Sequence, residues 1–164
     1  MTTDPPLAIA VASSAEDMET ARQLFQEYAA SLDIDLSFQD FGEELRSLPG
    51  EYAFPGGRLI LAWHGDEAAG CVALRRFTRT TCEMKRLFVR PQFRGLGIGR
   101  QLAEEVIRQA QRMGYRRMVL DTIGSMRTAI WLYISLGFTE ILSYRYNPVP
   151  GARFFSLDLD RPRP

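Results

Sequence analysis

The chain is poor in the residues that build metal centres and nucleophilic triads. Its 164 residues include one histidine, His64, and two cysteines, Cys71 and Cys82. The histidine stands in the run His64–Glu67, which reads as a turn. If the two cysteines lie on one hairpin that turns near residue 79, they are several positions apart along the ladder, which is too far for a disulfide. We therefore expect no metal site and no Ser-His-Asp triad.

The chain also lacks an excess of charge and long apolar runs. Twenty basic and twenty acidic residues give a formal net charge of zero, and Lys85 is the only lysine. Zero net charge argues against general attraction to nucleic acid or to an anionic membrane. No apolar run approaches the ~20 residues of a membrane span, and the N-terminus shows no signal-peptide pattern. We expect a cytoplasmic protein with neither nucleic acid nor membrane as a partner.

The length and the hydrophobic content predict one domain. A chain of 164 residues is close to the common domain size of ~100–150 residues. A hydrophobic fraction of 46% is enough for a core. We find no internal repeat and no linker, so the single domain is expected to cover residues 1–164.

The most informative stretch is the glycine-rich run from Arg94 to Arg100. It follows the apolar run 87–89 and Pro91, and it opens an amphipathic segment that stops at Gly114. This order predicts a strand, a glycine-rich turn and a helix. The first N–H groups of a helix lack intrahelical partners and carry partial positive charge, so such a turn suits phosphate oxygens.

The spacing of the glycines limits which class of phosphate-containing ligand this turn can bind. A dinucleotide fingerprint, G-x-G-x-x-G/A, fails because its last position would be Arg100 or Leu102, and no P-loop run is present. The pattern R-x-x-G-x-G does fit, with Arg94 first and Gly99 last. This resembles the pyrophosphate loop of the GNAT acyl-CoA N-acyltransferases. The alternative is a glycine-rich turn that binds no ligand.

Hydrophobic periodicity predicts alternating strands and helices. Ser13 or Ser14 is the expected cap of the first helix, and Ser13 with Glu16 fits a capping box. Ser125 is the expected cap of the last helix. Apolar residues change parity between Met84 and Leu87. This change fits either a strand buried on both faces or a β-bulge near Lys85 and Arg86, and the resemblance to the GNAT family implies the bulge. The expected strands are 7–12, 59–63, 68–77, 81–89, 117–121, 139–146 and 153–158. The expected helices are 14–31, 41–48, 98–113 and the segment between Ser125 and Gly137.

These elements predict an α/β fold with a mixed, mainly antiparallel sheet and helices on both faces. The same order of elements is found in the GNAT family. The resemblance covers nearly the whole chain and is most specific from Cys82 to Leu159. It implies a single GNAT N-acetyltransferase domain that uses acetyl-CoA as co-substrate and needs no metal.

The resemblance also implies where acetyl-CoA binds. The glycine loop would take the pyrophosphate through backbone N–H groups, and arginines would add charge. The strand before the loop would pair with the pantetheine arm, and an N–H near Phe88 would stabilise the oxyanion, an effect of ~2.7–4 kcal/mol per donor elsewhere. The implied cofactor-binding residues are Leu87, Phe88, Val89, Arg94, Gly95, Leu96, Gly97, Ile98, Gly99 and Arg100.

Two residues are candidates for catalysis by the same resemblance. Tyr133 stands in Y-x-x-x-G-F before Gly137, where the family carries its general acid; the alternative is a core tyrosine. An ordinary pKa of ~10 would keep it protonated. Glu83 stands where histone-acetyltransferase-like members carry a base; the alternative is an exposed strand carboxylate paired with Arg76.

The acceptor site is expected between residues 31 and 57 and at the last hairpin. The first segment is rich in acidic residues, which would attract a cationic amine, although a solvated acidic loop explains them equally well. Phe38, Phe41, Tyr52 and Phe54 would line a pocket or cover the core. Tyr144, Tyr146 and Asn147 are expected on the opposite rim. A last hairpin exposing Tyr144, Tyr146 and Phe154 would allow a homodimer.

The resemblance therefore implies transfer of acetyl from acetyl-CoA to an amine of a small molecule or peptide by direct attack in a ternary complex. One alternative is a CoA-binding sensor or regulatory module without turnover. Another is transfer of a longer acyl group, or transfer to a hydroxyl.

Overall fold

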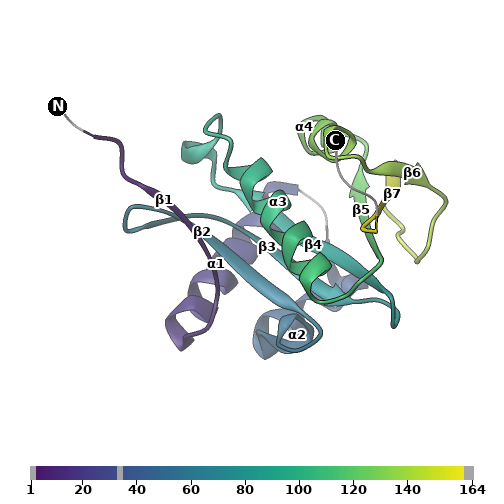
Figure 1. Cartoon of the computed structure of the whole chain (residues 1–164), viewed down its shortest axis with the longest axis horizontal. Coiled ribbons are helices and arrows are strands. Elements are labelled where there is room, and N and C mark those ends of the chain that lie inside the picture. The colour runs from purple at the N-terminus through teal and green to yellow at the C-terminus, as the bar shows by residue number, and fades with distance from the viewer. Residues whose placement is uncertain (1–2, 33–34, 161–164) are drawn as a thin grey trace.

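The computed structural model describes residues 3–32 and 35–160. Seven strands form one open sheet in the order β1-β2-β3-β4-β5-β7-β6 (Figure 1). All neighbouring strands are antiparallel except β4 and β5. The predicted mixed, mainly antiparallel sheet is confirmed. The strands are β1 Leu7–Val11, β2 Arg58–His64, β3 Glu67–Arg76, β4 Thr81–Val89, β5 Arg117–Ile123, β6 Thr139–Ile141 and β7 Ala152–Asp158.

Helices cover both faces of the sheet, as expected. The helices are α1 Ala15–Leu32, α2 Phe41–Ser47, α3 Ile98–Arg112 and α4 Arg127–Ser135, with short 3₁₀ turns η1 Ser37–Gln39, η2 Gly50–Tyr52 and η3 Pro91–Phe93. Alternate residues of β2 enter different cores: Ile60 packs with α3, whereas Leu59 packs with α1. In Figure 1, α3 crosses the near face of the central strands. This alternation follows from the two-residue period of a strand.

The first helix is capped by Ser14, one of the two residues expected in this role. The Ser14 hydroxyl accepts the Asp17 N–H at 3.0 Å, and the Asp17 carboxylate accepts the N–H groups of Ser13 and Ser14 at 2.9 and 3.3 Å. The predicted pair of Ser13 and Glu16 is therefore wrong. The shorter Asp17 side chain performs the reciprocal role that a capping box usually gives to glutamate.

The predicted β-bulge in β4 is confirmed. Cys71 of β3 lies opposite Phe88, but Ala73 lies opposite Lys85, so β4 carries one extra residue between these pairs. Arg86 adopts a positive φ of 60° there. The extra residue resets the alternation, and the apolar residues on both sides of the bulge join the α3 core: Cys82, Met84, Leu87 and Val89.

Strands β4 and β5 pair only at their beginnings. The parallel register joins Thr81–Glu83 to Arg117–Val119. From Met84 to Val89, within the described residues, β4 has a strand partner only on its β3 side. The two strands separate beyond this point, and the sheet is open where the glycine loop begins.

Two local predictions in the last third are wrong. The strand expected at 139–146 ends at Ile141, and Tyr144 turns back to pack edge-on against Phe77 and Phe154. Helix α4 begins after Met126 without a side-chain cap, so Ser125 does not serve as the cap. In the described ranges, no helix is long and apolar enough to cross a membrane.

Candidate active site

A groove runs between the open end of β4 and helix α4. The groove has a volume of about 510 Å³. The groove wall includes every predicted cofactor-binding residue except Leu96, which is exposed. The opposite wall comes from Ser125, Arg127, Thr128, Ala129 and Leu132. The structure thus brings the loop and strand of the predicted acetyl-CoA site together on one surface.

The glycine loop presents unused backbone donors to this groove. From Gly95 to Arg100, no backbone N–H donates to an acceptor within residues 3–32 and 35–160. Gly95 and Gly97 have positive φ values of 84° and 78°, and a Cβ at either position would meet open space. Glycine allows this conformation without strain. The loop is therefore shaped to hold an anionic group against the N-terminus of α3.

The loop arginines are partly engaged by the protein. The Arg94 Nε donates to the Val89 carbonyl at 3.2 Å. The Arg100 guanidinium donates to Ser135 Oγ and lies 3.6 Å from a Glu104 oxygen. Both side chains border the groove, so they can add positive charge there without being dedicated to it.

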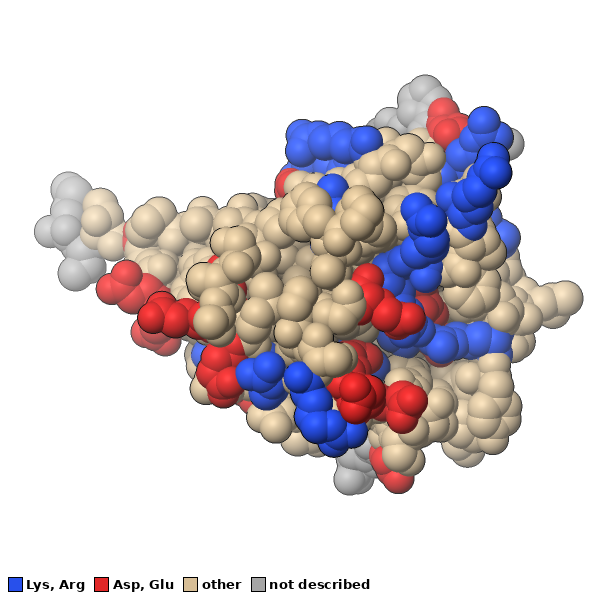
Figure 2. Space-filling model, turned by 90° about the horizontal axis from the view of Figure 1, so that it is seen from below, with Lys and Arg blue, Asp and Glu red and all other residues tan. Residues whose placement is uncertain are grey.

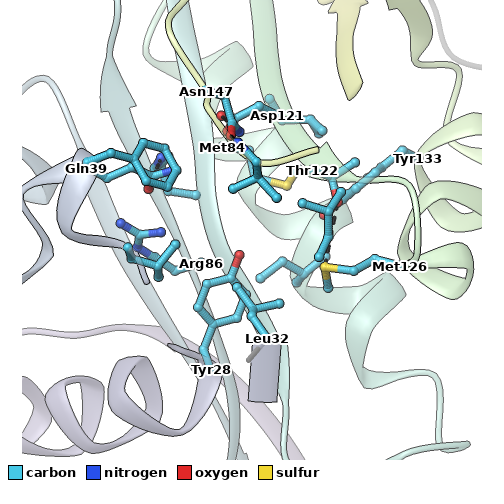
Figure 3. Close-up of a pocket in the computed structure, with 17 residues that line it drawn as sticks. Tyr28, Leu32, Gln39, Met84, Arg86, Asp121, Thr122, Met126, Tyr133 and Asn147 are labelled. Atoms are coloured by element: carbon cyan, nitrogen blue, oxygen red, sulfur yellow. Dashed lines mark hydrogen bonds between the residues drawn. The ribbon is translucent and has the colours of Figure 1, made fainter. Parts of the chain in front are cut away.

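A second, more enclosed pocket lies between the separating strands (Figure 3). Its open volume is about 40 Å³. Figure 3 shows Gln39 and Arg86 on one side, Tyr133, Thr122 and Met126 on the other, and the Tyr28 hydroxyl pointing in from below. Tyr28, Leu87 and Met126 line both the groove and this inner pocket. The two cavities therefore adjoin at these residues.

Tyr133 lies in the inner pocket rather than in the groove. Its ring packs against Phe138 and Phe155, with centroids 5.7 and 6.4 Å away. Its hydroxyl has no hydrogen-bond partner among the described residues. Burial, followed by the nearby Tyr28 and the Asp121 carboxylate, raises the pKa of Tyr133 above its ordinary value. The side chain combines a packed ring with a protonated hydroxyl that is free to donate.

Glu83 has a different environment from both sequence interpretations. It is fully buried rather than exposed, and it pairs with Arg75 rather than Arg76. Its oxygens accept from Arg75 at 2.8 Å, from Arg145 at 3.0 Å and from the Tyr144 hydroxyl at 2.5 Å. Burial raises the pKa of Glu83, but the charges of Lys85 and Arg75, with the other donors, outweigh burial and lower it overall.

The charged residues of the inner pocket differ in whether a residue of opposite charge pairs with them. Arg86 is buried and forms a two-pronged pair with Glu44 at 2.8 and 2.9 Å. Lys85 is also buried, and its Nζ donates to the Gln39 Oε1 at 2.9 Å. Asp121, on β5, accepts from the Asn147 Nδ2 at 3.0 Å. The pocket wall thus contains Arg86, which is paired with a carboxylate, and two charged residues whose hydrogen-bond partners are neutral, Lys85 and Asp121.

The acidic segment expected to attract a cation is largely neutralised. Glu44 is paired with Arg86, Glu51 with Arg75, and Glu43 with Arg46. Two of these arginines come from the sheet, so the local sequence did not reveal them. Figure 2 shows acidic and basic side chains lying beside one another on the face that carries α1 and α2. Asp33 lies outside the described residues.

The expected acceptor residues divide between pocket, core and surface. Phe38 and Asn147 line the inner pocket, Tyr52 is buried in the α1 core, and Phe54 is exposed beneath the Arg58 guanidinium. Phe41 packs against the Arg86 guanidinium at 5.1 Å. Tyr144 and Phe154 are packed together, so Tyr146 is the one of the three hairpin aromatics that is strongly exposed.

Sequence reasoning missed three residues of the inner pocket. Tyr28 lines both cavities, although the sequence pattern gave it no role. Lys85 drew notice only as the single lysine of the sequence, and Asp121 was given no role. The signal that could have drawn attention to Lys85 was a charged residue at the predicted bulge of an otherwise apolar strand.

The fold and the groove define a class of protein: an acyltransferase with a glycine loop at the N-terminus of a helix beside an open strand. The model of the Acetyltransferase (GNAT) family matches residues 18–138. An uncharacterized N-acetyltransferase of Schizosaccharomyces pombe is 37% identical over 158 residues, which cover 94% of this chain and 96% of that protein. The chain belongs to the GNAT family, and it is an acetyl-CoA-dependent acyltransferase.

Solved structures agree on the fold. An acetyltransferase from Streptococcus agalactiae superposes with a TM-score of 0.77 at 23% identity, covering 93% of this chain and 98% of that one. A Salmonella typhimurium protein solved with its cofactor acetyl-CoA superposes with a TM-score of 0.68 at 21% identity, covering 94% of each chain. At these identities, the likeness supports the architecture alone.

Proposed function

We propose that this protein transfers an acetyl group from acetyl-CoA to the primary amine of a small molecule within a ternary complex. The observation that carries the proposal is the junction of the two cavities at Tyr28, Leu87 and Met126. A ligand that fills the groove and another that fills the inner pocket would meet there. Direct attack needs this arrangement, because the reacting atoms must approach to ~3–3.5 Å.

The groove suits acetyl-CoA in two ways. The unused N–H groups from Gly95 to Arg100 can take the pyrophosphate, and the open edge of β4 from Met84 to Val89 can take the amide-rich pantetheine arm. This would bring the thioester beside Leu87 and Phe88, at the mouth of the inner pocket. The bound acetyl-CoA of the Salmonella relative supports the same use of the fold.

Tyr133 is proposed as the proton donor. In the reaction, a bond forms between the amine nitrogen and the acetyl carbon, and the carbon–sulfur bond breaks. The ammonium form of the amine loses two protons in total. One replaces the proton that Tyr133 donates to the leaving sulfur, and the other passes to solvent. The raised pKa of Tyr133 keeps its hydroxyl protonated at neutral pH.

The contacts of Glu83 favour a structural role over that of a base. A general base must reach the acceptor proton directly or through one water. The Glu83 carboxylate is fully buried and already accepts from two arginines and a tyrosine. The lowered pKa also makes it a weak base. Its assignment as the base stays a prediction that the Glu83→Gln variant tests.

The test is CoA thiol release with a panel of amines, amino acids and peptides. Intersecting initial-rate lines are expected for a ternary complex, and parallel lines would contradict direct attack. Butyryl-CoA run beside acetyl-CoA tests the preference for a longer acyl group. Acetyl-CoA binding without release for any amine would favour the non-catalytic CoA sensor instead.

A further inference from the structure

Lys85 is an unusual feature of the inner pocket. Lys85 is only 5% exposed, and its ammonium donates a hydrogen bond to the neutral side-chain oxygen of Gln39. Within the described ranges, no carboxylate lies within ion-pair distance of it. Burying a charge without a charged partner is costly. The Glu83 and Asp121 carboxylates act on Lys85 only from beyond ion-pair distance, so the ammonium can still take a directly contacting counter-ion from a ligand.

The other buried charges of the chain are paired. The described residues include three buried charged side chains: Glu83, Lys85 and Arg86. Glu83 is held by two arginines, and Arg86 is held by Glu44. The protein therefore pairs buried charge elsewhere, and Lys85 is the exception. Lys85 also lines the cavity, whereas Glu83 does not.

Asp121 supplies the opposite charge on the same cavity wall. It stands on β5, across the opening between the strands from Lys85 on β4, and it forms no ion pair with any described residue. Burial and the charge of Arg86 lower the pKa of Lys85 to about 8, even though the Glu83 and Asp121 carboxylates oppose this shift. The ammonium is therefore mostly charged at neutral pH. A small cavity that carries one unpaired charge of each sign suits a ligand that carries both.

We propose that the acetyl acceptor is a small amino acid, whose carboxylate binds to Lys85 and whose amino group lies toward Asp121. The inference rests on the proposed function, since it names the occupant of the acceptor pocket. A polyamine would place a second ammonium against Lys85, and a peptide would carry its carboxylate far from its N-terminal amine. The enclosed volume of about 40 Å³ also favours a compact acceptor.

The first experiment compares matched acceptors on the wild-type protein. Each amino acid of a panel, including β-alanine and γ-aminobutyrate, is paired with its own primary amide. The amide keeps the size and the position of the amine but removes the negative charge. Because this change also lowers the pKa of the amine, kcat/KM is compared per concentration of unprotonated amine. Loss of one charge-assisted contact costs ~10–100-fold, so we expect kcat/KM for the best acid to exceed that of its amide by about this factor. Equal values for acids and amides would overturn the inference.

The second experiment changes the lysine. In Lys85→Met, which keeps the length but not the charge, the preference for the acid should collapse toward unity through a higher KM. Lys85→Arg should retain part of the preference. Arg46→Met is the control, because Arg46 is exposed on α2 and, among the described residues, pairs only with Glu43. The acid preference of this variant should equal that of the wild type. A preference that survives in Lys85→Met would refute the assignment. If Lys85→Met fails to bind acetyl-CoA, the inference is judged from two other results: the acid and amide rates of the wild-type protein and the acid preference of Lys85→Arg.

A binding measurement separates this inference from the proposed function. Calorimetry on the protein saturated with CoA needs no turnover. Binding of an acid but not of its amide, lost in Lys85→Met, supports the carboxylate site even if no acceptor is acetylated, and then only the proposed catalysis fails. Turnover of neutral amines with no preference for acids would leave the catalytic proposal standing and refute the carboxylate site.

Discussion

Replacing Glu83 by glutamine tests whether this residue is a base or a structural anchor. Glu83 on β4 is 0% exposed and joins two other parts of the chain: Arg75 on β3 and the Tyr144–Arg145 turn that follows β6. Glutamine keeps the shape and can still accept hydrogen bonds, but it removes the charge. Two arginines, each less than a third exposed, then lose their buried counter-charge.

The expected loss of stability in Glu83→Gln follows from these contacts. Removing one partner of a buried ion pair costs ~3–5 kcal/mol. Arg75 keeps a second partner, Glu51, which is 71% exposed, so we expect the lower end, about 3 kcal/mol. For a chain of this size, about 1 kcal/mol shifts Tm by ~2–4 °C, which gives a fall of ~6–12 °C. The turnover rate per folded molecule should stay within about twofold of wild type, because catalysis proceeds elsewhere.

The assay is a thermal unfolding curve and a single-turnover rate on the same preparation. Glu51→Gln is the matched control, since it removes the exposed partner of the same arginine and should cost at most ~1 kcal/mol. An unchanged Tm together with a rate loss above ~100-fold would refute the structural reading and make Glu83 the base.

The effect of Glu83 also depends on pH. Its pKa is lowered in the folded protein, so its ionised form stabilises the fold at pH values above the ordinary value of 4.5. That contribution is lost as the pH falls through the folded pKa. The Tm difference between wild type and Glu83→Gln should therefore shrink below about pH 4.5.

Four further predictions test other parts of the site. Tyr133→Phe should keep acetyl-CoA affinity and lose ~10²–10⁴-fold in turnover rate, at the lower end of that range; a destabilised protein with the full rate would contradict the acid role. Gly99→Glu should abolish acetyl-CoA binding by calorimetry, while Gly99→Ala should bind, because its Cβ would lie 3.7 Å from Val89 in ordinary contact. The acid-to-amide ratio of kcat/KM should fall above pH about 8 as Lys85 loses its proton, and a ratio constant to pH 9.5 would contradict this. The predicted homodimer requires twice the monomer mass by light scattering at micromolar concentration.

Most of the fold followed from local patterns in the sequence. The stripe from Ile98 to Met113 predicted α3 within one residue, because an amphipathic period is a local property. The change of parity between Met84 and Leu87 marked an irregularity in β4, and the family resemblance favoured the bulge that the structure shows there. The capping pair of α1 was predicted one residue too early, since Ser13 and Ser14 are equally suitable by composition and only the backbone conformation decides between them.

The inner pocket could not be predicted in the same way. Lys85 meets Gln39 across 46 positions of sequence, and Glu83 meets Tyr144 across 61. Such pairs depend on where β4 and β5 separate, and no local period encodes this. The strand expected at 139–146 fails for the same reason: its alternation is compatible with a strand, but Tyr144 gains a buried hydrogen bond to Glu83 by turning back.

The short pairing of β4 with β5 means that this sheet is incomplete as the chain alone builds it. If the pantetheine arm occupies the free edge from Met84 to Val89, acetyl-CoA becomes a structural member of the sheet as well as a reactant. A ligand at 100 times its Kd stabilises the folded state by about 2.7 kcal/mol. The concentration of acetyl-CoA would then set the stability of the folded enzyme. The free and the acetyl-CoA-bound forms would unfold at different rates even before an acceptor binds.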